Sequence, residues 1–60
     1  MTGKDFVRQL KAAGWTLDRI SGSHHIMIKG DQEVSVPVHA GKDLATGTLH
    51  RLLKATGLKI

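Results

Sequence analysis

Hydrophobic residues recur with helical spacing over the first thirteen positions of the chain. Four apolar side chains share one helix face: Phe6, Val7, Leu10 and Ala13. Thr2 can cap this helix, and Asp5 follows three residues later in an aspartate variant of the capping box. Gly14 suits the position just past a helix end. The pattern therefore predicts an amphipathic helix between Thr2 and Gly14.

The hydrophobic period changes from helical to alternating between positions 15 and 38. Three extended runs are separated by turn sequences at Gly22-Ser23 and at Gly30-Asp31-Gln32. The third run alternates most regularly, and its inward-facing positions are all valine: Val34, Val36 and Val38. Pro37 cannot donate to a strand ladder, which places it near a strand end or on an edge. These runs predict an antiparallel meander of three strands.

A second helical pattern follows a loop at positions 39–44. It begins at Thr46 or Thr48, and its apolar stripe is expected to be buried: Leu49, Leu52, Leu53 and Thr56. Leu58 and Ile60 are expected to fold back as an apolar tail.

The element order α-β-β-β-α is that of a double-stranded-RNA-binding domain. In such an α+β fold, two helices pack on one face of a three-stranded antiparallel sheet. A chain of 60 residues is long enough for one such domain, so we expect a single domain over residues 1–60.

The charge balance indicates a polyanionic partner. Nine Lys and Arg residues against five Asp and Glu give a net charge of +4, which favours nucleic acid ahead of membrane. Phe6 and Trp15 are the only aromatic residues, too few for a platform that stacks successive bases. Basic side chains form a stripe on each predicted helix: Lys4, Arg8 and Lys11 on the first, and Arg51 and Lys54 on the second. Each stripe either contacts RNA phosphates or is simply a solvated helix face.

The composition gives no sign of a metal, a cofactor or a membrane segment. The chain has no cysteine, and its acidic residues lack the spacing of metal ligands. The longest unbroken apolar run, at positions 26–28, is far too short to span a bilayer. The N-terminus reads as the start of a helix rather than a signal peptide, so a cytoplasmic location is expected.

Histidine is the residue type that most readily supplies acid–base chemistry near neutral pH. The chain has four: His24, His25, His39 and His50. Any one of them can equally be a surface polar residue or a core histidine satisfied by a hydrogen bond. Adjacent His24 and His25 point to opposite faces if both lie in a strand, which argues against a shared metal.

Short motifs occur in a fixed order along nearly the whole chain: Gly14-Trp15, Arg19, Gly22-Ser23-His24, Val36-Pro37-Val38-His39, Leu44, Gly47-Thr48-Leu49 and Gly57-Leu58. In this combination the chain resembles the HicA toxin family. Two departures lie outside the motifs: Thr56 stands where alanine is common, and Met27 where an aromatic residue is frequent.

The resemblance implies a toxin of a type II toxin–antitoxin system. Such a protein is a metal-independent endoribonuclease that cleaves mRNA and is neutralised by a HicB-like antitoxin. The family's catalytic histidine maps to His24, with Gly22 and Ser23 as the supporting motif. Three cations are candidates to stabilise charge near it, on proximity within the meander: Arg19, Lys29 and Lys42.

Two expectations about the position of His24 conflict with each other. Strand alternation places it on the side of Ile26 and Ile28, which are expected to be buried, whereas a catalytic histidine must reach RNA. An open or bulged sheet edge just after the Gly22-Ser23 turn would resolve this. Two other functions stay open: a non-catalytic double-stranded-RNA-binding-like module, and an interaction protein whose basic surface meets an acidic partner.

Overall fold

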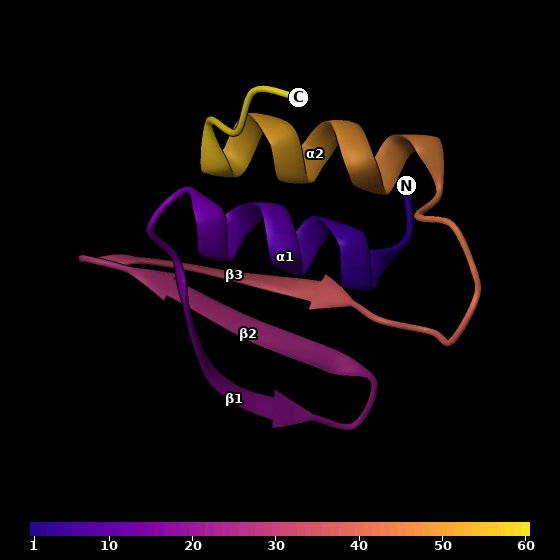
Figure 1. Cartoon of the computed structure of the whole chain (residues 1–60), viewed down its shortest axis with the longest axis horizontal. Coiled ribbons are helices and arrows are strands. Elements are labelled where there is room, and N and C mark those ends of the chain that lie inside the picture. Colours follow the sequence, from indigo (N-terminus) through magenta and orange to yellow (C-terminus); the bar gives the residue numbers. More distant parts are fainter.

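The expected order of elements is confirmed in a computed structural model that describes residues 1–60. It contains two helices and three strands: α1 (Gly3–Ala12), β1 (Thr16–Ser21), β2 (His24–Lys29), β3 (Gln32–Pro37) and α2 (Thr46–Thr56). The strands form one open antiparallel sheet in the order β1-β2-β3. In the view of Figure 1, β1 lies lowest, and α1 and then α2 lie above β3. This is an α-β-β-β-α fold of the α+β class. Neither helix is long and apolar enough to cross a membrane.

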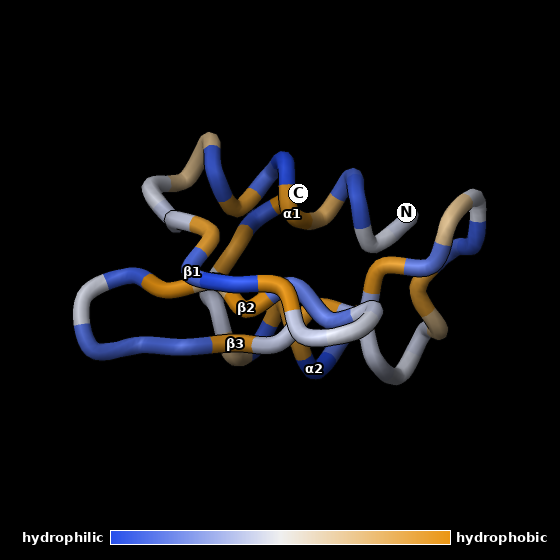
Figure 2. Tube along the Cα trace, turned by 90° about the horizontal axis from the view of Figure 1, so that it is seen from below, coloured by the Kyte–Doolittle hydropathy of each residue, from blue (hydrophilic) through white to orange (hydrophobic).

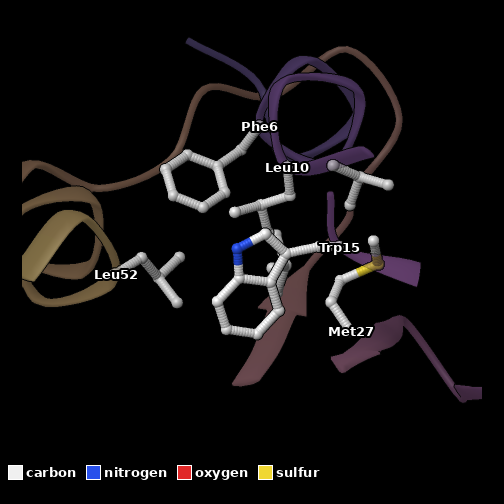
Figure 3. Close-up of a cluster of buried hydrophobic side chains, with 7 residues drawn as sticks. Phe6, Leu10, Trp15, Met27 and Leu52 are labelled. Atoms are coloured by element: carbon white, nitrogen blue, oxygen red, sulfur yellow. The ribbon is translucent and has the colours of Figure 1, made fainter. Parts of the chain in front are cut away.

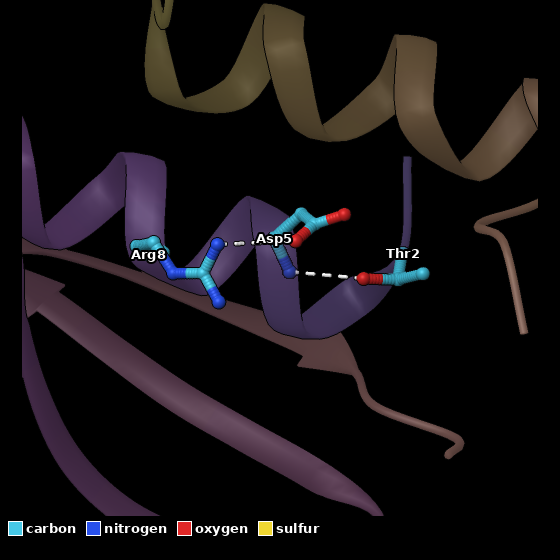
Figure 4. A network of polar contacts seen from close by, with 3 residues as sticks. All are labelled: Thr2, Asp5 and Arg8. Atoms are coloured by element: carbon cyan, nitrogen blue, oxygen red, sulfur yellow. Dashed lines mark hydrogen bonds and ion pairs between the residues drawn. The ribbon is translucent and has the colours of Figure 1, made fainter. Parts of the chain in front are cut away.

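Thr2 and Gly14 delimit α1 as the sequence predicts, but the predicted capping box does not form in full. The Thr2 hydroxyl accepts a hydrogen bond from the Asp5 backbone N–H at 3.0 Å (Figure 4). The Asp5 carboxylate does not return to Thr2 but accepts from the Arg8 guanidinium at 3.4 Å. At the other end Gly14 has φ +97°, and the Lys29 ammonium donates to the Ala13 carbonyl at 2.9 Å.

The sheet contains one irregularity, in β1. Leu17 pairs with Met27 but Arg19 pairs with Ile26, so Asp18 is an extra residue in the ladder. Without it, alternation would place Arg19 on the side of Leu17. The bulge was expected after the Gly22-Ser23 turn, and that expectation is wrong because β2 pairs regularly with both neighbours beyond the turn.

The core lies between α1, α2 and one face of the sheet. Seven buried side chains form it: Phe6, Val7, Leu10, Trp15, Met27, Val36 and Leu52. Phe6 and Leu52 approach from the two helices, while Trp15 and Met27 come from the sheet side (Figure 3). Helix α1 contacts all three strands, whereas α2 contacts only β3.

The other face of the sheet has no helix on it. Because side chains alternate, β2 directs His25 and Met27 toward the core and His24, Ile26 and Ile28 the opposite way. Ile26 is 9% exposed, so it is buried as expected, whereas Ile28 is only half-buried and the expectation is wrong for that residue. Neither side chain belongs to the core cluster under α1. Figure 2 shows α1 on one side of the strands and the mixture of hydrophobic and hydrophilic positions along them.

The C-terminal segment is packed only in part. Helix α2 begins at Thr46 without a side-chain cap and ends at Gly57, which has φ +70°. Leu58 packs against the core as expected. Ile60 is 64% exposed, so the expectation that it folds back is wrong.

Candidate functional site

His24 is exposed on the uncovered face of the sheet, at the first position of β2. The turn before it depends on Gly22, whose φ of +60° favours glycine. The Ser23 carbonyl accepts from the Val38 backbone N–H at 2.7 Å, which ties this turn to the end of β3. His24 thus stands at a well-held corner of the sheet, and the conflict over its exposure disappears because its face carries no helix.

One hydrogen-bond partner holds the His24 ring. The Nδ1 atom lies 3.2 Å from the Ser35 hydroxyl oxygen, across the sheet on β3. Ser35 pairs with Ile26 in the ladder, so it approaches His24 diagonally. If the hydroxyl accepts, Nδ1 carries the proton and Nε2 keeps a free lone pair that can act as a base. If the hydroxyl donates, Nε2 carries the proton and is a hydrogen-bond donor.

A shallow depression surrounds this ring, and we call it the His24 hollow. Its lining consists of Ser21, Gly22, Ser23, His24, Ile26 and Ser35. The lining therefore offers three serine hydroxyls and one imidazole, and Ile26 is its single large apolar side chain. Such a surface can offer hydrogen bonds to a sugar–phosphate group, and His24 is the only histidine that lines it.

Of the three cations expected near His24, only Arg19 shares its face. The Asp18 bulge brings Arg19 opposite Ile26, and its guanidinium pairs with Asp18 and lies 3.8 Å from the Glu33 carboxylate. These ion pairs are exposed, so each contributes at most about 1 kcal/mol. Arg19 can therefore exchange its carboxylate partners for a phosphate at small cost.

Lys29 and Lys42 do not reach the His24 hollow. Lys29 stands at the far end of β2 on the opposite face, and its ammonium caps α1 through the Ala13 carbonyl. Its expected place beside His24 is wrong, because the five-residue separation along the strand is odd and reverses the face. Lys42 borders a different pocket, together with His39 and Thr48 in front of α2.

The basic stripe of α1 lines a pocket. Lys4, Arg8 and Lys11 border a second pocket whose other walls include Leu17 and His25. His25 points away from His24, as expected of adjacent strand residues.

The basic stripe of α2 is exposed and lines no pocket. Arg51 and Lys54 are exposed on the side away from Leu52, and neither forms an ion pair within the chain.

Sequence reasoning did not identify Ser35 as a functional candidate. The alternating valines indicated that Ser35 faces away from the core, but not which residue it meets. That depends on the β2–β3 register, which the turn at residues 30–31 sets. A turn of that length, read together with the outward position of Ser35, was the available signal.

These features define a class of protein: a small basic α-β-β-β-α domain with a lone exposed imidazole on its open sheet face. A family model described as the HicA toxin of bacterial toxin–antitoxin systems matches residues 3–58. The chain belongs to the HicA toxin family. It is therefore a toxin of a type II toxin–antitoxin system, in a family of ribonuclease-like toxins, and has an antitoxin as partner. Neither the curated proteins nor the solved structures gave a significant match.

Proposed function

We propose that this toxin is a metal-independent endoribonuclease that cleaves mRNA, with His24 as the general base. The observation that carries the proposal is the exposed His24 ring on the helix-free sheet face, with Nδ1 3.2 Å from the Ser35 hydroxyl. Nε2 of His24 has no hydrogen-bond partner within the chain. An imidazole held through one nitrogen and free at the other is suited to move a proton on a bound substrate.

The reaction uses the nucleophile that RNA itself carries. Neutral His24 removes the proton of a ribose 2′-hydroxyl, and the 2′-oxygen attacks the adjacent phosphorus. The bond from phosphorus to the 5′-oxygen breaks, and that oxygen leaves with a proton from water or from the protonated imidazole. The products are a 2′,3′-cyclic phosphate and a 5′-hydroxyl. General acid–base assistance of this kind contributes roughly 10²–10⁴-fold.

Arg19 is the cation that we assign to the reacting phosphate. It is on the same face as His24 and is held only by exposed carboxylates. A guanidinium forms paired hydrogen bonds with phosphate oxygens and stabilises the added negative charge of the pentacovalent phosphorus. The α2 stripe, Arg51 and Lys54, contributes sequence-independent contacts to the RNA backbone.

The antitoxin partner that we propose is HicB-like and covers the corner of residues 22–25. The toxin carries a net charge of +4, so an acidic partner is drawn to the surface that attracts RNA. Covering the His24 hollow blocks both the base and the substrate. Because the partner binds only the native state, it also raises the stability of the fold.

One observation favours a second function, a non-catalytic RNA-binding module. The His24 hollow contains no titratable side chain besides His24. A ribonuclease with one imidazole must use it, or water, for both proton transfers, whereas a binding module needs neither.

Cleavage of labelled RNA by the purified protein in excess chelator separates these functions. We expect the wild type and a His50→Ala control to cleave, since His50 is exposed on α2. His24→Ala should not cleave but should bind RNA within a few-fold of the wild type. Binding without cleavage by the wild type would favour the module, and cleavage that needs added metal would contradict the mechanism.

A further inference from the structure

The pocket between α1 and the β1–β2 hairpin has no part in the proposed reaction, yet it combines three cations with a histidine ring that has no hydrogen-bond partner in the chain. We call it the α1 pocket, and its lining is Lys4, Val7, Arg8, Lys11, Leu17 and His25. Its volume is about 240 Å³. That is smaller than the roughly 300–1,000 Å³ of sites that hold whole small-molecule ligands, and suits a single phosphate group.

We propose that the α1 pocket binds a backbone phosphate of the same RNA whose neighbouring segment lies at His24. This inference rests on the proposed function for the identity of the ligand. The α1 pocket would then be a second RNA subsite, on the face of the sheet opposite to His24, and His25 would contact the phosphate.

The arrangement of charge on α1 favours an anionic ligand. Lys4, Arg8 and Lys11 stand at intervals of four and three residues, so their side chains are neighbours on one helix face. Like charges at these spacings repel one another, and a bound anion relieves that repulsion. Lys4 and Lys11 have no ion partner in the chain, and Arg8 has only the exposed Asp5 carboxylate at 3.4 Å. All three cations are thus available to a ligand.

The His25 ring has one buried nitrogen and no hydrogen-bond partner in the chain. Its Nδ1 is buried and has no hydrogen-bond partner, whereas Nε2 is not buried. A buried N–H without an acceptor costs more than a buried lone pair, so the ring proton of neutral His25 belongs on Nε2. The accessible edge of the ring therefore presents an N–H donor, and the ring lines the α1 pocket. A donor surrounded by three cations fits an anionic oxygen.

The path between the His24 hollow and the α1 pocket is short. Ser21 pairs with His24 and Ile20 pairs with His25, so consecutive ladder positions carry the two histidines on opposite faces. No strand pairs with the outer edge of β1. Ile20 is 57% exposed on the His25 side of this corner. An RNA strand that follows the Gly22 corner from the His24 hollow reaches the α1 pocket directly.

The test measures RNA affinity in a His24→Ala background, so that cleavage does not enter the binding result. Lys11→Gln and Lys59→Gln each remove one charge, but only Lys11 borders the pocket. Lys11→Gln should weaken binding of a long single-stranded RNA and lower the magnitude of the salt slope by about 0.7. Lys59→Gln should leave the salt slope unchanged.

The role of His25 is tested by two substitutions of similar size. His25→Phe removes the donor and should lower RNA affinity by roughly tenfold, while His25→Gln keeps an N–H near the Nε2 position and should restore it. With His24 intact, His25→Phe should raise KM for RNA and leave kcat unchanged. Thermal unfolding of each variant shows whether the fold survives, and Lys11→Gln tests the pocket without touching the core.

Three results would overturn the inference. Unchanged RNA affinity and salt slope in Lys11→Gln and His25→Phe would show that RNA does not enter the pocket, whatever the outcome for His24. Weaker binding of the antitoxin with unchanged binding of RNA would assign the pocket to the protein interface. A loss of kcat in His25→Phe without a change in KM would place His25 in the reaction instead. The proposed function fails separately, if the wild type does not cleave RNA at all.

Discussion

The two faces of the sheet are made by the same strands and are used in opposite ways. Under α1, Met27 and Val36 are fully buried in a cluster that includes residues from both helices. On the other face, His24 and Ser35 remain exposed and contact each other. A domain of 60 residues cannot cover both faces with two helices. Its stability therefore depends on one face, and that leaves the other free for chemistry.

The largest difference between the faces should be in stability. Met27→Ala removes a fully buried side chain and should lower the free energy of unfolding by about 2–5 kcal/mol. Ile28→Ala, one residue along on the open face, should cost about 1 kcal/mol, because Ile28 is only partly buried and lies outside the core cluster. Denaturant unfolding of both variants measures this. Equal losses would show that the open face contributes to folding as much as the core.

The next effect concerns acid pH and acts on cleavage and binding with opposite signs. Protonation of His24 removes the base, so the cleavage rate should fall about tenfold per pH unit in acid. The added positive charge should leave RNA affinity equal or higher, since phosphate contacts dominate it. Parallel rate and binding curves measure the two responses. A rate that holds constant into acid, with binding intact, would exclude a neutral imidazole as the base.

A smaller effect is expected from the residue that orients the ring. Ser35→Ala removes the contact to His24 Nδ1 and should lower kcat roughly three- to tenfold, as expected for one neutral hydrogen bond. KM should stay the same, and Ser35→Thr should restore the rate because it keeps the hydroxyl. Thr16→Ala, on the same face but away from the His24 hollow, serves as the control. If the threonine variant is as slow as alanine, the hydroxyl is not the orienting group.

The smallest effect should come from releasing Arg19 on the open face. Glu33→Gln removes one of its two carboxylate partners, so RNA affinity should rise about two- to threefold at low salt, since exposed ion pairs are weak. Arg19→Gln should lower affinity and cancel the gain when combined with Glu33→Gln. An additive double variant would mean that Glu33 repels RNA directly rather than through Arg19.

The sequence predicted the elements well because their signals are local. Thr2 and Gly14 delimit α1, and Gly57 ends α2, through conformations that neighbouring residues decide. It did not predict which face of β2 the helices cover. That strand is apolar at both alternating positions, with Met27 toward the helices and Ile26 away from them, so only the packing of distant segments distinguishes the faces.

The candidate site shows the same division between local and distant information. The resemblance of a short motif to the HicA family predicted His24 as the catalytic residue, and Gly22 predicted the turn before it. Its environment required pairings that no local pattern contains: the extra residue Asp18, which rotates Arg19 onto the His24 face, and the register that places Ser35 beside the ring. Pairing between strands, rather than composition, decides these contacts.

The proposed activation of the RNA 2′-hydroxyl by His24 is best tested by the chemistry of the cleavage products. Cleavage in excess chelator should leave a 2′,3′-cyclic phosphate and a 5′-hydroxyl, identified by mass spectrometry of the fragments. An RNA with a 2′-deoxy sugar at the cleaved position should bind equally well and remain intact. Fragments that end in a 5′-phosphate, or cleavage at the 2′-deoxy position, would contradict the account.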